Sequence, residues 1–315
     1  MLTTPTRFPL AVLPTPLVPA RRLSAALDRE VWIKRDDLTG FALGGNKVRA
    51  LEVIVAEALD QGCDHLVGCG GPASNLCSVL AAAAATAGLG CTLVLHGSEP
   101  AVAHPNLAMM RAFGARTWFT GDPDRAATPE HAAAAADRLG RRGRRPYVVP
   151  RGAASGSGAT AYALAAEELA AQLTFRPAHV VAAAGSGGTL AGLLAGWSTF
   201  GLPGRLVGVA VSRTLAETRR EVIRLAGEAA RALGAGEPDS DRLRLLDGLG
   251  AGFGRPDRAT CDAARLAVRT EGMMADTTYV ARAVAALGSL DGPVVLWHTG
   301  GWLGCVGDAM GAGHG

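Results

Sequence analysis

The sequence has few aromatic residues and little net charge. Phe, Trp and Tyr make up 5% of the 315 residues, whereas hydrophobic residues in total make up 49%. The core must therefore consist mainly of Ala, Val and Leu, which suits helices packed against buried strands. The formal net charge is only +3, and the basic run 141–145 has no interleaved aromatic residues. We interpret that run as a solvated loop and expect no nucleic-acid partner.

Cysteine pairs and long apolar runs are also missing. The six cysteines show no CxxC spacing, so we expect neither a metal site nor a disulfide framework, but thiols in a reducing cytoplasm. No apolar run of 18 residues is free of turn signals, and five prolines interrupt the first 20 residues. We therefore expect no membrane span and no signal peptide.

Short apolar runs alternate with segments of helical spacing along most of the chain. At about 100 to 200 residues per domain, this length favours two domains with a cleft between them. The strands that we predict are 31–34, 65–68, 91–96, 116–119, 146–149, 179–184, 205–211 and 294–298. The predicted helices are 46–61, 74–88, 105–114, 130–140, 158–173, 189–200, 214–233, 259–270 and 279–287. Alternation of this kind predicts an α/β fold with parallel sheets.

A glycine-rich segment, GSGGTLAG at 185–192, follows a strand of small apolar residues and opens a helix. Glycines allow successive backbone N–H groups to converge on an anion, and the helix N-terminus adds positive potential. The segment lacks the Lys-Ser/Thr pair of a nucleotide-binding P-loop. It therefore predicts a phosphate-binding loop, although a simple tight turn without a ligand has the same composition.

One lysine stands at the beginning of a predicted helix. The segment GGNK ends at Lys47, and a cation at a helix N-terminus is in an unfavourable position, which lowers its pKa. A neutral amine of that kind can form a Schiff base with a carbonyl group. Lys47 could instead point into water, but an amine together with a phosphate-binding loop favours pyridoxal phosphate as the cofactor.

The segment PASN at 72–75 ends a glycine-rich turn before an alanine-rich helix. Ser74 could simply cap that helix. Alternatively, Ser74 and Asn75 present a hydroxyl and an amide to a substrate. The same turn reads G-x-G-x-x-A from Gly68, which leaves a nicotinamide-dependent oxidoreductase as an alternative, weakened by Pro72 and by the lack of an acidic residue before Glu99.

Longer motifs extend over nearly the whole chain. They are PTPL from Pro14, KRDDLTGFALGGNKVR at 34–49, YVVPRGAASGSGATAY at 147–162, VSRT at 211–214, DTTYVARA at 276–283 and HTGG at 298–301. Together they resemble the D-cysteine desulfhydrase and 1-aminocyclopropane-1-carboxylate deaminase family. The resemblance implies a two-domain, parallel-sheet enzyme of pyridoxal-phosphate fold type II, similar to the tryptophan synthase β subunit. It also implies a small amino acid as substrate and a homodimer.

The resemblance also implies roles for individual residues. Lys47 would form the Schiff base, Asn75 would contact the pyridoxal 3′-oxygen, and Thr299 would lie at the pyridine nitrogen. Ser74 and Tyr279 would be the active-site hydroxyls. The phosphate loop would consist of Gly185, Ser186, Gly187, Gly188 and Thr189. For these groups to meet, we expect residues 1–49 and 159–315 to form a large cofactor domain and residues 50–158 a small one.

Three positions depart from the family pattern. Leu76 replaces a polar residue beside the substrate loop, and Phe253 stands where the family commonly has a tyrosine. Val280 follows Tyr279 where cyclopropane deaminases carry a glutamate, which argues against ring opening. We therefore expect α,β-elimination or β-replacement on a small amino acid, with a ring-opening deaminase or a non-catalytic cofactor-binding protein as alternatives.

Overall fold

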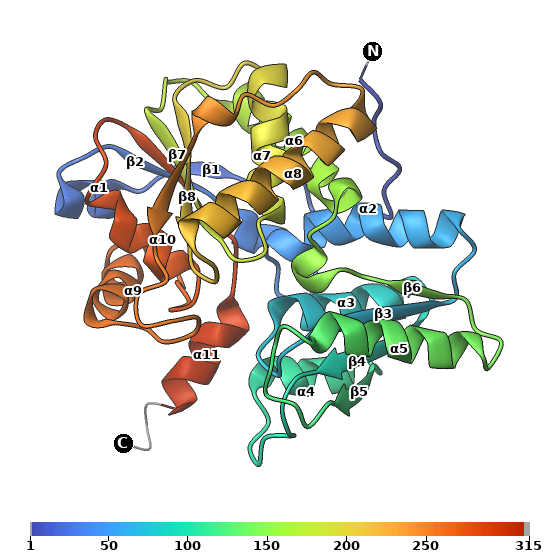
Figure 1. Cartoon of the computed structure of the whole chain (residues 1–315). Coiled ribbons are helices and arrows are strands. Elements are labelled where there is room, and N and C mark those ends of the chain that lie inside the picture. The colour runs from blue at the N-terminus through green and yellow to red at the C-terminus, as the bar shows by residue number, and fades with distance from the viewer. Residues whose placement is uncertain (1, 312–315) are drawn as a thin grey trace.

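The chain folds around two β-sheets, as the computed structural model of residues 2–311 shows (Figure 1). The larger sheet has the order β1-β2-β10-β7-β8-β9. Its strands are β1 (Leu17–Pro19), β2 (Val31–Lys34), β7 (His179–Ala184), β8 (Arg205–Ala210), β9 (Leu243–Asp247) and β10 (Val294–Trp297). All neighbours in it are parallel except the edge pair β1 and β2, which is antiparallel. The expectation of a parallel sheet is thus confirmed with one exception at the edge.

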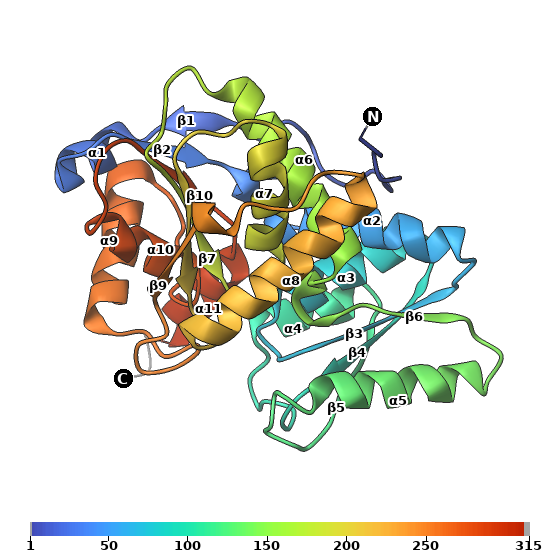
Figure 2. The same ribbon diagram turned by 45° about the horizontal axis from the view of Figure 1, so that its top comes forward.

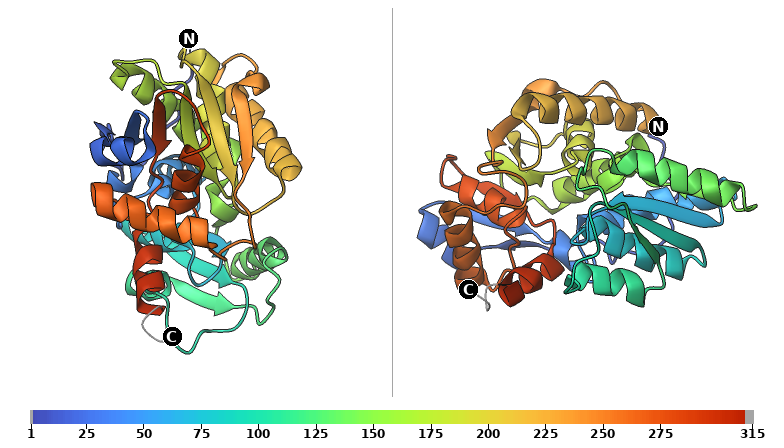
Figure 3. Two further views of the ribbon diagram at one scale, coloured as in Figure 1. Left: turned by 90° about the vertical axis from the view of Figure 1, so that its left-hand side faces the viewer. Right: turned by 60° about the horizontal axis from the view of Figure 1, so that its bottom comes forward.

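The smaller sheet comes from the middle of the chain. Its order is β5-β4-β3-β6, and all of its neighbours are parallel. The strands are β3 (His65–Gly70), β4 (Gly90–Leu95), β5 (Arg116–Phe119) and β6 (Pro146–Val148). Figure 3 shows from two further sides that these strands lie together beside the larger sheet.

Helices cover both faces of each sheet. They are α1 (Arg21–Leu27), α2 (Asn46–Asp60), α3 (Asn75–Thr86), α4 (Pro105–Ala112), α5 (Thr128–Gly140), α6 (Gly156–Gln172), α7 (Gly188–Thr199), α8 (Leu215–Leu233), α9 (Arg258–Glu271), α10 (Val280–Leu287) and α11 (Trp302–Gly311). Three short 3₁₀ turns are η1 (Asp36–Leu38), η2 (Arg151–Ala153) and η3 (Ser240–Arg242). Within residues 2–311, no helix combines the length and the apolar composition needed to cross a bilayer.

Alternating side chains of the central strands belong to different cores. In β7, Val180 and Ala182 pack with α6, α7 and α8, whereas Val181 and Ala183 pack with α1, α9 and α10. Figure 2 shows α7 and α10 on opposite sides of this strand. In the smaller sheet, Leu66 packs with α2, α3 and α4, whereas Val67 packs with α5 on the other face. Burial on both faces explains why these strands read as continuous apolar runs.

The abundance of Ala and Gly has a direct packing reason. A Cβ atom on Gly192 of α7 would lie 2.1 Å from the carbonyl oxygen of Ala159 in α6. Two helices can approach this closely only where the contacting residue has no side chain. The small residues therefore permit tight layers on a core with few aromatic side chains.

Candidate active site

A cavity of about 480 Å³ lies where the carboxyl ends of the parallel strands of both sheets meet. Segments that directly follow β3, β4, β6, β7, β8 and β10 contribute to its wall. Ligands bind at this edge of open α/β sheets, and the volume suits a small cofactor with its substrate. The residues to which the family resemblance assigns a site role all line the cavity: Lys47, Ser74, Asn75, Gly185, Ser186, Gly187, Gly188, Thr189, Tyr279 and Thr299.

Lys47 presents its amine to this cavity from the first turn of α2. The Nζ atom donates a hydrogen bond to the carbonyl oxygen of Gly152 at 3.0 Å. Burial lowers the pKa of Lys47 to about 8. The sequence predicted a lowered pKa from the helix N-terminus, whereas the cause that the structure provides is removal of the amine from water.

The chain contains only two lysines, Lys34 and Lys47. Lys34 ends β2 of the larger sheet and is fully buried, and its amine donates to the carbonyl oxygen of Thr15 at 2.7 Å and forms an ion pair with Glu168. Lys34 does not line the cavity. Lys47 is therefore the one lysine whose amine is available to a ligand there.

Three segments that are distant in sequence are fastened together beside Lys47. The side-chain amide of Asn46 donates to Thr189 Oγ1 at 3.0 Å, and its backbone N–H donates to the carbonyl oxygen of Thr299 at 2.9 Å. A Cβ atom on Gly300 would lie 2.6 Å from the Cα atom of Gly45, so that glycine is required for the approach. Lys47, the glycine-rich loop and the last strand are thereby held in one geometry.

The glycine-rich loop has the form of an anion site. It follows β7, and α7 begins at Gly188 after Gly187, whose φ angle is +96°. A Cβ atom on Gly185 would lie 2.8 Å from the Tyr279 ring, so the loop closely approaches the opposite wall. Arg213 donates to the carbonyl oxygen of Ser186 at 3.2 Å and adds positive charge behind the loop. Backbone N–H groups at the start of a helix of this length bind phosphate well.

Ser74 and Asn75 form the facing wall. Ser74 Oγ accepts the backbone N–H of Cys77 at 3.2 Å, so the capping role that its sequence allows does occur. Asn75 Oδ1 accepts from the side chain of Asn106 at 3.2 Å, and Asn106 also donates to the carbonyl oxygen of Ala73. The cap and the Asn106 bridge fix the orientation of both side chains toward the cavity.

Tyr279 and Phe253 lie together on the remaining side. Their ring centroids are 6.1 Å apart in an edge-to-face arrangement. Burial raises the pKa of Tyr279 to about 12, so its hydroxyl keeps its proton at neutral pH. Val280 is 1% exposed and packs into the core with α9 and α10, away from the cavity.

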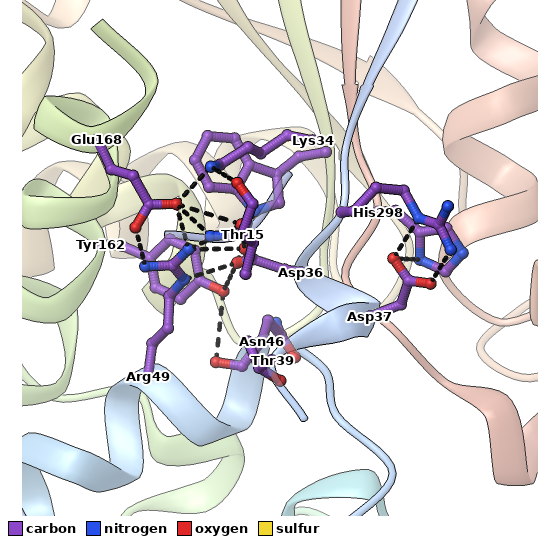
Figure 4. Close-up of polar contacts among 12 residues, drawn as sticks. Thr15, Lys34, Asp36, Asp37, Thr39, Asn46, Arg49, Tyr162, Glu168 and His298 are labelled. Atoms are coloured by element: carbon purple, nitrogen blue, oxygen red, sulfur yellow. Dashed lines mark hydrogen bonds and ion pairs between the residues drawn. The ribbon is translucent and has the colours of Figure 1, made fainter. Parts of the chain in front are cut away.

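A buried polar network supports the start of α2 (Figure 4). Asp36 Oδ2 accepts from the Tyr162 hydroxyl at 2.7 Å and from Trp297 Nε1 at 2.8 Å, and Oδ1 accepts from Arg49 at 2.9 Å. Burial alone would raise the pKa of Asp36, but Arg49 and these donors hold it below its ordinary value. Glu168 receives two bonds from Arg49 and completes the network.

Sequence analysis missed several side chains of the cavity. They are His96, His104, Arg125, Arg151 and Arg213. His96 ends the predicted strand 91–96, and Arg125, Arg151 and Arg213 follow predicted strands, a position that could have identified them. Arg151 and Arg213 also stand in two of the longer motifs, at 147–162 and 211–214. Among residues 2–311, no group of three or more His, Cys, Asp or Glu side chains is arranged to hold a metal ion.

Comparison with known proteins agrees with this geometry. The family model described as pyridoxal-phosphate dependent enzyme matches residues 9–300. The chain belongs to this family. Its cofactor is therefore pyridoxal phosphate, and the predicted fold type and the assignment as an enzyme are confirmed.

Individual relatives of this pyridoxal-phosphate enzyme cover nearly its full length. D-cysteine desulfhydrase from Yersinia enterocolitica is 38% identical, with 91% of each chain covered. D-cysteine desulfhydrase from Salmonella newport is 37% identical, covering 94% of this chain and 95% of the relative. A solved structure described as an ACC deaminase homologue has a TM-score of 0.92 at 34% identity, covering 98% of this chain and 96% of the other. The protein thus falls within the D-cysteine desulfhydrase and ACC deaminase group.

The residues of the cavity fit the cofactor. A lysine amine and a glycine loop at a helix N-terminus share one cavity, as an aldehyde that carries a phosphate requires. The nicotinamide alternative is wrong. Gly68 and Gly70 lie inside β3 and not in a turn after it, and a Cβ atom on Gly68 would lie 2.4 Å from Leu80. Gly68 therefore serves helix packing and does not approach a ligand.

Proposed function

We propose that this enzyme is a lyase that removes a β-substituent from a small amino acid. The observation that supports it most directly is the position of Lys47, the one lysine on a cavity that also holds the glycine-rich loop and the hydroxyl groups of Ser74 and Tyr279. Pyridoxal phosphate, when bound, withdraws electrons from the α-carbon of an amino acid. The surrounding side chains must then bind the amino acid and move protons.

Each side chain has a role that its surroundings support. Lys47 holds the cofactor and, once released by the incoming amino group, takes the α-proton on its amine, which a pKa of about 8 allows near neutral pH. The β-substituent leaves with the electron pair of its bond to the β-carbon. Water then converts the remaining product to an oxoacid and ammonia. Ser74 and Tyr279 supply hydroxyl groups for proton transfer.

Other residues hold the cofactor and the substrate. Residues 185–189 would bind the phosphate, Asn75 would contact the 3′-oxygen, and Thr299 would be a neutral partner of the pyridine nitrogen, since all of them line the cavity. The backbone N–H groups around Ser74 bind the substrate carboxylate. Val280 is buried away from the cavity, which favours elimination over the opening of a cyclopropane ring.

The decisive experiment combines Lys47→Ala with borohydride reduction. Reduction of the holoenzyme should fix the cofactor on the peptide that contains Lys47, as mass spectrometry would show. Lys47→Ala should lose the near-visible absorbance and the turnover while its melting profile stays cooperative, because the first turn of a helix accepts alanine. The substrate screen uses D- and L-amino acids and 1-aminocyclopropane-1-carboxylate, with release of sulfide, ammonia and oxoacid measured.

The control and the contrary outcomes are equally definite. Arg142→Gln, on the exposed loop after α5, should keep both absorbance and turnover. Cofactor fixed on the peptide of Lys34, or steady turnover by Lys47→Ala without added amine, would contradict the assignment. Holoenzyme absorbance without release of any product would indicate a non-catalytic cofactor-binding protein.

The larger organisation belongs to the same proposal. We propose that residues 1–49 with 159–315 act as the cofactor domain and residues 50–158 as the small domain, in a cytoplasmic homodimer. The two sheets, which take their strands from these parts of the chain, support the division. Light scattering on the purified holoenzyme measures the oligomeric state.

A further inference from the structure

The cavity carries more positive charge than the cofactor and a substrate carboxylate require. Arg213 is held at the phosphate loop through its bonds to the carbonyl oxygens of Gly185 and Ser186, so its charge would belong with the cofactor phosphate. Arg125 and Arg151 also line the cavity. They belong neither to the phosphate loop nor to the turn at Ser74, which leaves two guanidinium groups without an assigned anion.

Arg125 and Arg151 are joined into one unit. Arg151 Nη1 donates to the backbone carbonyl oxygen of Arg125 at 2.8 Å, so η2 and the loop before α5 are fastened together. The guanidinium carbon of Arg125 lies 3.9 Å from the centroid of the Phe253 ring. Phe253 follows β9 of the larger sheet, and its ring also contacts Tyr279.

Phe253, which stands where the family commonly has a tyrosine, therefore has a structural role of its own: its ring holds Arg125. An arginine on an aromatic face is held by a cation–π interaction. The contact fixes Arg125, which comes from the side of the smaller sheet, against a loop of the larger sheet. The result is a cationic group held against the Phe253 ring, which itself contacts Tyr279.

No acidic side chain neutralises this pair. Within residues 2–311, neither Arg125 nor Arg151 has a carboxylate oxygen within 4.0 Å. Among the described side chains that line the cavity, the one acidic group belongs to Asp276, whose carboxylate accepts the backbone N–H groups of Thr278, Tyr279 and Val280. Burial, and then the charge of Arg151, lower the pKa of Arg125. Two like charges in a partly buried cavity raise the free energy of the protein until an anion joins them.

We infer that Arg125 and Arg151 form a subsite for a substrate whose β-substituent is itself an oxyanion that can leave with the electron pair of its bond, such as a phosphate or sulfonate group. The inference rests on the proposed function, since it names the substituent that would leave. The planar guanidinium group of an arginine donates two parallel hydrogen bonds to the oxygens of such an anion. A neutral thiol substituent would need no pair of arginines to bind it. The substrate class is then a 3-substituted alanine with a negatively charged substituent.

The test measures binding to the holoenzyme, so it needs no turnover. The probes are 2-amino-3-phosphonopropionate, which cannot lose its substituent, and alanine, each as D and L enantiomers. Changes in cofactor absorbance give the dissociation constants, and ligand-induced rises in melting temperature give a second readout. Wild-type protein should prefer the phosphonate by about 100-fold, since charge-assisted hydrogen bonds to two arginines are lost in alanine.

Variants and a competitor make the test specific. Arg125→Gln and Arg151→Gln should each reduce that preference by about tenfold or more. Arg142→Gln removes an exposed arginine outside the cavity and should keep the preference within about threefold. A wild-type preference below about threefold, or equal preferences in all the proteins, would overturn the inference. The inference would also be overturned if inorganic phosphate bound to the holoenzyme as strongly as the phosphonate does. The two arginines would then bind any phosphate-like anion and would not recognise the amino acid that carries it.

A turnover assay separates this inference from the function on which it rests. O-phosphoserine and 3-chloroalanine carry an anionic and a neutral leaving group, respectively. The kcat/KM ratio of the two should fall in both arginine variants by the factor seen in binding. Release of oxoacid from neither compound, or from any amino acid screened, would refute the proposed lyase, whereas phosphonate binding would still decide the subsite.

Discussion

The two lysines of the chain show how the surroundings of a residue decide its chemistry. Lys34 lies among acceptors and is paired with Glu168, whereas Lys47 is desolvated beside one backbone carbonyl. Burial lowers the pKa of both, but only Lys47 faces a cavity. A desolvated amine without an acidic partner is prepared to react as a neutral nucleophile.

The pH dependence of cofactor capture should reveal this amine. Because the pKa of Lys47 is lowered from 10.5 to about 8, the neutral fraction should rise about tenfold from pH 7 to pH 9 and then level off. Stopped-flow absorbance of the apo-protein mixed with pyridoxal phosphate measures the rate. Nα-acetyl-lysine, measured at the same pH values, corrects for titration of the aldehyde. A protein rate that climbs about 100-fold over that range, as for an ordinary lysine, would contradict the lowered pKa.

Ser74 and Tyr279 should contribute through their hydroxyl groups. Since Phe253 cannot transfer a proton, Tyr279→Phe and Ser74→Ala should each reduce kcat by about 10²- to 10⁴-fold on the true substrate. Cofactor absorbance should persist, because neither residue belongs to the phosphate loop or carries the amine. Steady-state kinetics with absorbance spectra check both expectations.

A matched control separates the cap of Ser74 from its chemistry. Ser155 accepts the backbone N–H of Gly158 at 3.0 Å and caps α6 as Ser74 caps α3, but it does not line the cavity. Both alanine substitutions should cost about 1 kcal/mol of stability, whereas Ser155→Ala should leave kcat within about twofold. If Ser74→Ala and Tyr279→Phe also stayed near the wild-type rate, Lys47 alone would carry the protons.

At the scale of elements, α2 is held at its first turns by buried charge. Asp36 on η1 bonds to Arg49 of α2, to Tyr162 of α6 and to Trp297 of β10, so one carboxylate joins several elements (Figure 4). The Tyr162 hydroxyl also lies 3.4 Å from the carbonyl oxygen of Asn46, next to Lys47. The network positions the first turn of α2, where Lys47 stands, and none of its side chains lines the cavity.

Asp36→Asn should therefore destabilise the fold and disturb Lys47. The substitution leaves the buried guanidinium of Arg49 without one of its two carboxylates, and loss of one partner of a buried pair typically costs about 3 to 5 kcal/mol. Urea unfolding measures the free energy, and the absorbance of the remaining folded holoenzyme reports on Lys47. Asp60→Asn, at the exposed end of the same helix, should change stability by less than about 0.5 kcal/mol. Equal stability of the two variants would mean that the network does not support α2.

Sequence patterns located most of the helices and strands, and they missed two strands and two helices. The helix start at Asn46 agrees with the structure, because a long periodic apolar face follows it there. The short strand at 116–119 also agrees, since a glycine lies shortly before it and another shortly after it. The missed elements are β1, α1, β9 and α11. β1 has three residues within a proline-rich segment and exists by pairing with β2, so its conformation depends on a distant strand.

At the scale of the whole molecule, the active site depends on how the two sheets are placed. The loop 185–189 and Thr299 follow β7 and β10 of the larger sheet, and Ser74 and Asn75 follow β3 of the smaller one. Lys47 lies between them, at the start of α2, which follows β2 and packs on the smaller sheet. Strand order brings the carboxyl ends of these strands to a common cavity. The contact of Arg125 with Phe253 crosses between loops of the two sheets at this cavity.

The sequence by itself determined the α/β class, the family and the residues that bear motifs, because glycine loops and apolar periodicity are local and can be read in chain order. Only the tertiary structure showed that Lys34 is enclosed while Lys47 is available, since both stand in one motif. It also decided that Arg125, Arg151 and Phe253 meet, because their proximity depends on packing between segments that are distant in the chain. The sequence thus shows which charged and aromatic residues are available, whereas packing in the folded chain determines which of them contact one another.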